Sequence, residues 1–164
     1  MPASIAPVLK TIILRELRAL DREIAAYPDD ESLWTTPPGA PNSAGNLALH
    51  LAGNLRHFIG ATLAKTGYVR DRDSEFSSKG LSRAELRAIV SDAMVELSSA
   101  LDTISDDQLN AEYPLPIQER RLNTSDFLIH LSVHLAYHLG QIDYHRRLST
   151  ASSESVNTMS VKEL

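Results

Sequence analysis

The sequence predicts an all-α protein, a four-helix bundle, and three observations lead to this prediction. Four long stretches repeat apolar residues at spacings of three and four, the period of an amphipathic helix. Two of the connections between them are long, and no stretch shows the alternation that is typical of a strand. Aromatic residues make up only 5% of the 164 residues, which favours a core of Leu, Ile and Ala, as in helical bundles.

The first predicted helix covers residues 7–27 and ends at a Pro-Asp-Asp sequence. A proline-rich loop follows, and its single Trp34 is expected to plug one end of the core rather than stack on a ligand. The second predicted helix covers residues 43–65. Ser43 is a good N-cap, and Gly67 fits the position after the helix end, where a left-handed turn is needed.

A charged run, residues 70–75, separates the second helix from the third and has two interpretations. Such a run is usually a solvated loop. Alternatively, Arg70 or Arg72 reaches back to order a site or to bind an anion, because guanidinium groups form strong hydrogen bonds with carboxylates and phosphates.

The third predicted helix begins at a capping box, Ser82 with Glu85, and continues to about residue 104. A short extra turn is expected at residues 106–109. The segment 112–123 contains two prolines and is expected to be extended or a brief hairpin.

Asn123 caps the fourth predicted helix, which continues to Leu148. The Ser-rich residues that follow show no apolar period. We therefore expect a single domain over residues 1–149 and a mobile tail over residues 150–164.

Composition excludes several classes of function. The 16 basic and 21 acidic residues give a formal charge of −5, and no basic cluster suggests a nucleic-acid partner. The absence of cysteine excludes disulfides, thiolate ligands and a cysteine nucleophile. Because no secretory segment or membrane-spanning run is found, we expect a cytoplasmic protein without a membrane partner.

Histidines concentrate on the fourth predicted helix, which carries four of the six in the chain. On a helical wheel His130, His134, His138 and His145 form a stripe together with Gln141. Two histidines four residues apart can hold one metal ion. The pairs His130/His134 and His134/His138 are equally good by spacing, so spacing alone does not select the ligands.

A third ligand must then come from the second predicted helix. His50, Asn54 and His57 lie along one stripe there, and His50 borders the buried face. One ion cannot easily take both histidines, which are about 10 Å apart along the helix axis. The alternative is that these histidines are core residues with no ligand to hold.

Three segments resemble the DinB-like (DNA-damage-inducible) superfamily of four-helix metal-binding proteins, and in particular one of its bacterial branches. They are LALHLAGNLRHFIG, RDRDSEF and HLAYHLGQIDYHRRL, in which a histidine directly precedes a Gly-Gln pair. The resemblance covers most of the chain. It implies an up-down-down-up bundle with a long crossover that often pairs into homodimers.

The resemblance also implies the ligand set. In that family one histidine of the second helix joins a pair on the fourth helix that ends just before the Gly-Gln, which here gives His50, His134 and His138. Four neighbours become candidates for supporting the ligands or contacting a substrate: Asn54, His130, Gln141 and His145. His57 falls on a position that the family does not use as a ligand.

Three imidazoles leave open positions on Zn²⁺ or Ni²⁺, as in a catalytic site. The resemblance to bacillithiol and mycothiol transferases makes a metal-dependent transferase that activates a low-molecular-weight thiol the leading expectation, with a small molecule as partner. The alternatives are a non-catalytic metal-binding stress-response protein and a metal-dependent hydrolase. The lack of an obvious carboxylate base weighs against the hydrolase.

Overall fold

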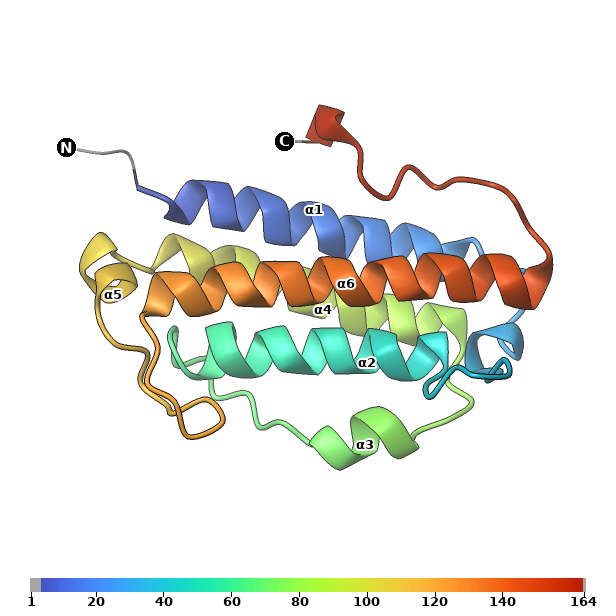
Figure 1. The fold of residues 1–164 in the computed structure, drawn as a ribbon, viewed down its shortest axis with the longest axis horizontal. Helices are drawn as coiled ribbons and strands as arrows, with labels where there is room; N and C mark the ends of the chain where they lie inside the picture. Colours follow the sequence, from blue (N-terminus) through green and yellow to red (C-terminus); the bar gives the residue numbers. More distant parts are fainter. Residues whose placement is uncertain (1–3, 164) are drawn as a thin grey trace.

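Four long helices form the bundle in the computed structural model, which describes residues 4–163 (Figure 1). They are α1 (Ala6–Ala25), α2 (Ala44–Leu55), α4 (Arg83–Asp102) and α6 (Thr124–Thr150). Helices α1 and α6 run in one direction and α2 and α4 in the other, and a long crossover joins α2 to α4 (Figure 1). The described part of the chain contains no strand. The predicted all-α, up-down-down-up bundle is therefore confirmed.

The bundle is held by the apolar faces that the periodic spacing predicted. Leu17 of α1, Leu51 of α2, Leu97 of α4 and Leu135 of α6 are all fully buried. Burying one such side chain stabilises the fold by about 1.5–3 kcal/mol. Trp34 packs its ring against Gly45, where an added Cβ would approach the ring to 2.7 Å. Its expected role as an anchor at one end of the core is confirmed.

Short helices lie in the connections and in the segment after α6. They are η1 (Ser32–Trp34), α3 (Arg72–Ser77), α5 (Asp106–Asn110) and η3 (Val161–Glu163). Helix α3 overlaps the charged run, for which a solvated loop is one of the two expectations, and the Asp71 side chain caps it by accepting a hydrogen bond from Ser74 N. The capping box of α4 and the N-cap of α6 are present as predicted.

Helix α2 does not continue as a regular α-helix to residue 65, so that expectation was wrong. Residues Arg56–Ala61 (η2) are π-helical instead. Thr62 N donates to His57 O, five residues back, at 3.0 Å. The Tyr113 hydroxyl donates to Phe58 O, the carbonyl that Thr62 N would use in an α-helix, at 2.7 Å. A tertiary contact thus takes the place of a helical hydrogen bond.

The segment between α5 and α6 folds as a short hairpin-like loop. Ile117 and Arg120 exchange both backbone hydrogen bonds, each 2.9 Å long. Tyr113 at its base is fully buried, and its ring packs 4.6 Å from the ring of Phe127, centroid to centroid. The loop is thereby fixed beside the N-terminal end of α6.

Beyond α6 the chain turns at Ala151, which has a left-handed φ of 53°, and passes back along α1 (Figure 1). Arg22 of α1 donates hydrogen bonds to the carbonyls of Val156 and Asn157, both 3.1 Å long. The domain boundary at residue 149 and the mobility of the tail stay predictions. None of the described helices is both long and apolar enough to cross a membrane.

Candidate metal centre

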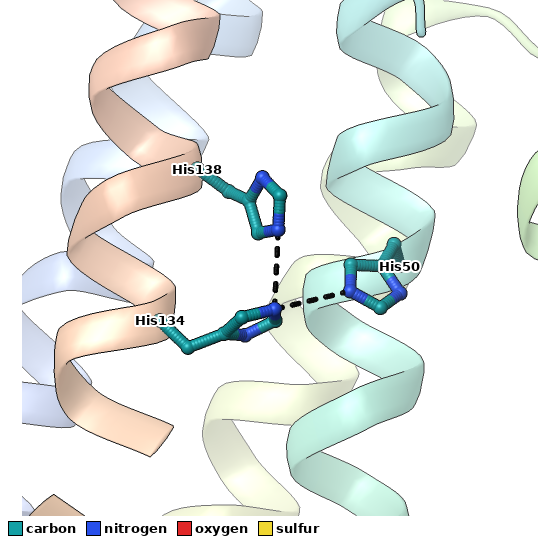
Figure 2. A group of neighbouring side chains, drawn as sticks. All are labelled: His50, His134 and His138. Atoms are coloured by element: carbon teal, nitrogen blue, oxygen red, sulfur yellow. Dashed lines mark hydrogen bonds between the residues drawn. The ribbon is translucent and has the colours of Figure 1, made fainter. Parts of the chain in front are cut away.

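Three imidazole rings converge between α2 and α6. His134 and His138 lie one turn apart on α6, and His50 faces them from α2 (Figure 2). His134 Nε2 is 3.4 Å from His50 Nε2 and 3.1 Å from His138 Nε2. One nitrogen from each ring lies within 4.8 Å of the other two.

These distances fit a single transition-metal ion. Two nitrogens that are each about 2.1 Å from one ion, at tetrahedral angles, lie about 3.4 Å apart. The observed separations of 3.4 and 3.1 Å are close to that value. The three histidines can therefore hold an ion with only small movements of their rings.

The outer nitrogens of two rings are held by oxygen atoms that accept hydrogen bonds. His50 Nδ1 is 3.0 Å from Glu75 Oε2, and His138 Nδ1 is 2.6 Å from Gln141 Oε1. His50 Nδ1 also lies 3.2 Å from Arg70 Nη2, but the Glu75 carboxylate, which only accepts, is nearer, and this favours a proton on Nδ1 and a lone pair on Nε2. The same reasoning makes His138 Nε2 an acceptor. His134 Nε2 lies close to both His50 Nε2 and His138 Nε2 but can donate a hydrogen bond to only one of them. At least one pair of nitrogen lone pairs therefore points at each other. A cation between the rings would remove this repulsion.

Glu75 reaches His50 because the chain leaves room for it. An added Cβ at Gly53 would lie 2.2 Å from Glu75 Oε1, so only glycine at this position of α2 lets the carboxylate approach. Arg70 holds the same carboxylate with two hydrogen bonds, Nε to Oε1 at 2.6 Å and Nη2 to Oε2 at 2.7 Å. The expected alternative for the charged run, in which Arg70 reaches back to order the site, is confirmed.

Electrostatics keep this carboxylate ionised and the imidazoles of His134 and His138 neutral. Burial acts to raise the pKa of Glu75, but hydrogen bonds from Arg70 and His50 outweigh it and hold that pKa below its ordinary value. Burial lowers the pKa of His134 to about 4, with a further contribution from the neighbouring His138. Burial also lowers the pKa of His138. Neutral imidazole is the form that binds a metal.

A cavity of about 740 Å³ opens in front of the three rings. Its walls come from α2, the π-helical segment, α6 and the hairpin-like loop at residues 115–118. Arg70 and Arg72 line it, and no acidic side chain among the described residues does. Arg72 is exposed and its guanidinium lies 5.2 Å from the centre of the Phe76 ring. The cavity is therefore shaped for a small molecule and positive in charge.

The remaining predicted site residues lie in different surroundings. Gln141 contacts His138 as described. Asn54 and His130 line the cavity; Asn54 is buried, and the exposed His130 stacks on Phe127 with ring centres 6.1 Å apart. His145 is not brought to the triad. Its Nδ1 is 2.7 Å from the Tyr27 hydroxyl and its Nε2 is 2.9 Å from Thr35 O.

His57 lies outside the triad, in agreement with the expectation that it is not a ligand, although its side chain lines the same cavity. One feature departs from the sequence reasoning. Glu75, the partner of His50, was not singled out. The signal was present as an acidic residue five positions after an arginine in RDRDSE, but such a run usually marks a solvated surface.

Comparisons with known proteins agree with this fold. The crystal structure of a DinB-like protein from Bacillus cereus ATCC 10987 superimposes with a TM-score of 0.68 at 18% sequence identity. The match covers 86% of this chain and 90% of that one. At this identity the likeness concerns the fold. No curated protein sequence matches the chain. The model of the family described as "Protein of unknown function (DUF1572)", a DinB-like family, matches residues 8–162, and the chain therefore belongs to that family.

Proposed function

We propose that the protein is a metal-dependent transferase that activates a low-molecular-weight thiol at His50, His134 and His138. The observation that carries the proposal is the convergence of three imidazole nitrogens, with the outer nitrogens of two rings held by Glu75 and Gln141. A divalent ion bound there lowers the pKa of a coordinated thiol and so supplies a thiolate near neutral pH. Zn²⁺ and Ni²⁺ suit three imidazoles and are the expected metals.

The residues of the chain prepare the site for an ion. Because the pKa of His134 is about 4, its ring is neutral at pH 7 and loses no proton on binding a metal. Glu75 fixes the orientation of the His50 ring through the contact at Nδ1, as carboxylates do in many histidine sites. Gln141 fixes the orientation of His138 in the same way.

The surroundings favour a thiol over water as the activated group. Hydrolysis needs a general base near the nucleophile. Among the described residues no carboxylate lines the cavity, and Glu75 is already engaged by Arg70 and His50. A metal-bound thiolate needs no such base. The positive wall at Arg72 further suits a thiol that carries a carboxylate.

Elemental analysis of three purified proteins tests the metal site. We expect about one transition-metal ion per chain in the wild type and in His130→Ala, and almost none in His134→Ala. His130→Ala is the matched control, because His130 lies one turn away on the same helix and outside the triad. Absence of metal from the wild type after incubation with Zn²⁺ and Ni²⁺ would make the three histidines core residues.

The activity is tested with the metal restored. We expect the wild type, but not His134→Ala, to join a thiol such as cysteine, N-acetylcysteine or glutathione to chlorodinitrobenzene. Bound metal without turnover of any thiol would favour the non-catalytic alternative. Pairing into homodimers stays a prediction, and sedimentation of the wild type is the measurement that checks it.

A further inference from the structure

A second cavity, of about 500 Å³, lies on the other side of His138. One wall is the proline-rich loop at residues 37–42, and the other is the face of α6 that carries Tyr137, Tyr144 and Leu148. No charged Asp, Glu, Lys or Arg among the described residues lines it. Its volume falls in the range of small-molecule sites, about 300–1,000 Å³. In contrast to the arginine-lined cavity, this one is apolar and aromatic.

The loop wall is fixed in place before any ligand arrives. Ala40 N donates to Pro37 O at 2.9 Å, which closes a turn with Pro38 and Gly39 at its centre. Gly39 has a φ of 83°, a value that glycine accepts without strain. The prolines restrict the backbone further. A rigid wall loses little entropy when a ligand binds.

His145 fixes the base of that loop. Its ring is buried between α6 and the loop, where it contacts the Thr35 carbonyl and the hydroxyl of Tyr27, which extends the end of α1. Burial lowers the pKa of His145, so the ring is neutral at pH 7. His145, a candidate for supporting the ligands or contacting a substrate, therefore lies at the base of the second cavity and away from the triad.

The two cavities meet at the metal ligands. Asn42 and His138 line both of them, and Gln141, which holds His138, lines the apolar one. A molecule in the apolar cavity lies against a ring of the triad. Meanwhile Tyr137 and Tyr144 are 63% and 68% exposed, an unusual state for two aromatic side chains on one helix face.

We propose that the apolar cavity binds the second substrate of the transfer, an electrophile with an uncharged aromatic or similarly flat apolar group. This inference rests on the proposed function. The thiol occupies the arginine-lined cavity, and the electrophile approaches from the tyrosine side. The thiolate sulfur forms a bond to the electrophilic carbon, the bond from that carbon to its halide breaks, and the halide leaves with the electron pair. The proton of the thiol is released to solvent.

Direct binding tests the cavity independently of turnover. Dinitrobenzene, which has no leaving halide, is titrated into the wild type, Tyr144→Ala and Val133→Ala while tyrosine fluorescence or NMR shifts are followed. Val133 is a matched control, because it lies on the same helix at 62% exposure and outside the cavity. We expect Tyr144→Ala to weaken binding at least tenfold and Val133→Ala to leave it unchanged. Equal binding by all three proteins would overturn the inference.

Kinetics with two electrophiles sharpen the test. Tyr144→Ala should raise KM for chlorodinitrobenzene at least tenfold and leave KM for the thiol and for iodoacetamide, which has no flat apolar group, unchanged. If no thiol is turned over but dinitrobenzene still binds at Tyr144, the proposed function fails and the ligand site stands. If Tyr144→Ala and Val133→Ala both convert a dimer into monomers in sedimentation, the exposed face is an interface between copies of the chain, and the inference is overturned.

Discussion

Helix α6 carries one polar cluster near its middle and another near its C-terminal end. In the second, Arg146 and Glu23 of α1 are both almost completely buried and form an ion pair at 2.6 Å. Asp143 accepts a further hydrogen bond from Arg146, and the tail contributes the carbonyl of Glu154 and the hydroxyl of Thr158. Each charge there meets an opposite charge from the same chain.

The histidine triad is arranged in the opposite way. At least one pair of acceptor nitrogens is opposed, and the charges around the triad belong to Glu75 and Arg70, which satisfy each other. The comparison teaches how to separate a structural cluster from a site. The ion pair is complete within the chain, whereas the triad keeps opposed lone pairs that a cation would satisfy. Four experiments test this difference.

The largest effect is expected from Arg146→Ala, which leaves Glu23 buried without its partner. Breaking a buried ion pair costs about 3–5 kcal/mol. Urea unfolding should show that loss, while the metal content of the folded variant stays that of the wild type. The double variant Glu23→Gln/Arg146→Met removes both charges and should recover most of the stability. A loss below about 1 kcal/mol in Arg146→Ala would contradict the structural role of the pair.

Removal of the metal comes next. A ligand that binds only the folded state stabilises it by about 2.7 kcal/mol at one hundred times its dissociation constant. Zn²⁺ or Ni²⁺ should therefore raise the melting temperature of the wild type but not that of His134→Ala. A chelator should abolish the difference between the two proteins. An equal response of both to the metal would remove His134 from the site.

Acid should lower the free energy of unfolding of the metal-free protein through protonation of His134. The pKa of His134 is about 4 in the folded state and about 6.5 when unfolded, so the unfolded state binds more protons between these values. Stability is fully present above pH 6.5 and is lost as the pH falls towards 4. The full shift corresponds to about 3.4 kcal/mol, which solvent screening of the partly exposed ring reduces to roughly 2 kcal/mol. Urea unfolding of the metal-free wild type across this range measures the slope. His134→Ala should flatten it, and an unchanged slope would argue against the lowered pKa.

The smallest effect is expected from Glu75→Gln, which keeps the shape of the side chain and removes its charge. Loss of a carboxylate that supports a histidine ligand typically weakens metal affinity tenfold to one hundredfold. Competition with a chromophoric chelator measures the change. Asp73→Asn is the matched control, because Asp73 lies on the same short helix and its carboxylate makes no contact with the triad. Equal affinities of the two variants would mean that Glu75 does not support the site.

The fold and the candidate ligands could both be predicted from the sequence, but for different reasons. The helices are predicted by the periodic spacing of apolar residues and by capping residues such as Ser82 and Asn123, because both act locally. The three ligands followed from a family resemblance, since spacing alone left His130/His134 and His134/His138 equal. The arrangement of Glu75 and Arg70 depends on Gly53 of α2, a long-range contact that no local pattern encodes.

Other contacts that the sequence does not reveal have the same physical origin. His145 shares the stripe of the triad on a helical wheel, but its place is decided by Tyr27 and Thr35, which lie more than 100 positions away in the sequence. In the sequence alone, Glu23 looks like an ordinary surface residue of an amphipathic helix. It is buried because α6 supplies Arg146 and the tail supplies Thr158.

The π-helical segment at the end of α2 affects the shape of the candidate site. In its wider turn the Phe58 carbonyl accepts a hydrogen bond from the hydroxyl of Tyr113. Tyr113 lies at the base of the hairpin-like loop, whose residues 115–118 line the cavity. Deleting one residue between positions 56 and 61 should restore the α-helical hydrogen bond to the Phe58 carbonyl and so displace the hydroxyl of Tyr113. The π-helical turn thus ties the end of the second helix to the loop that lines the candidate site.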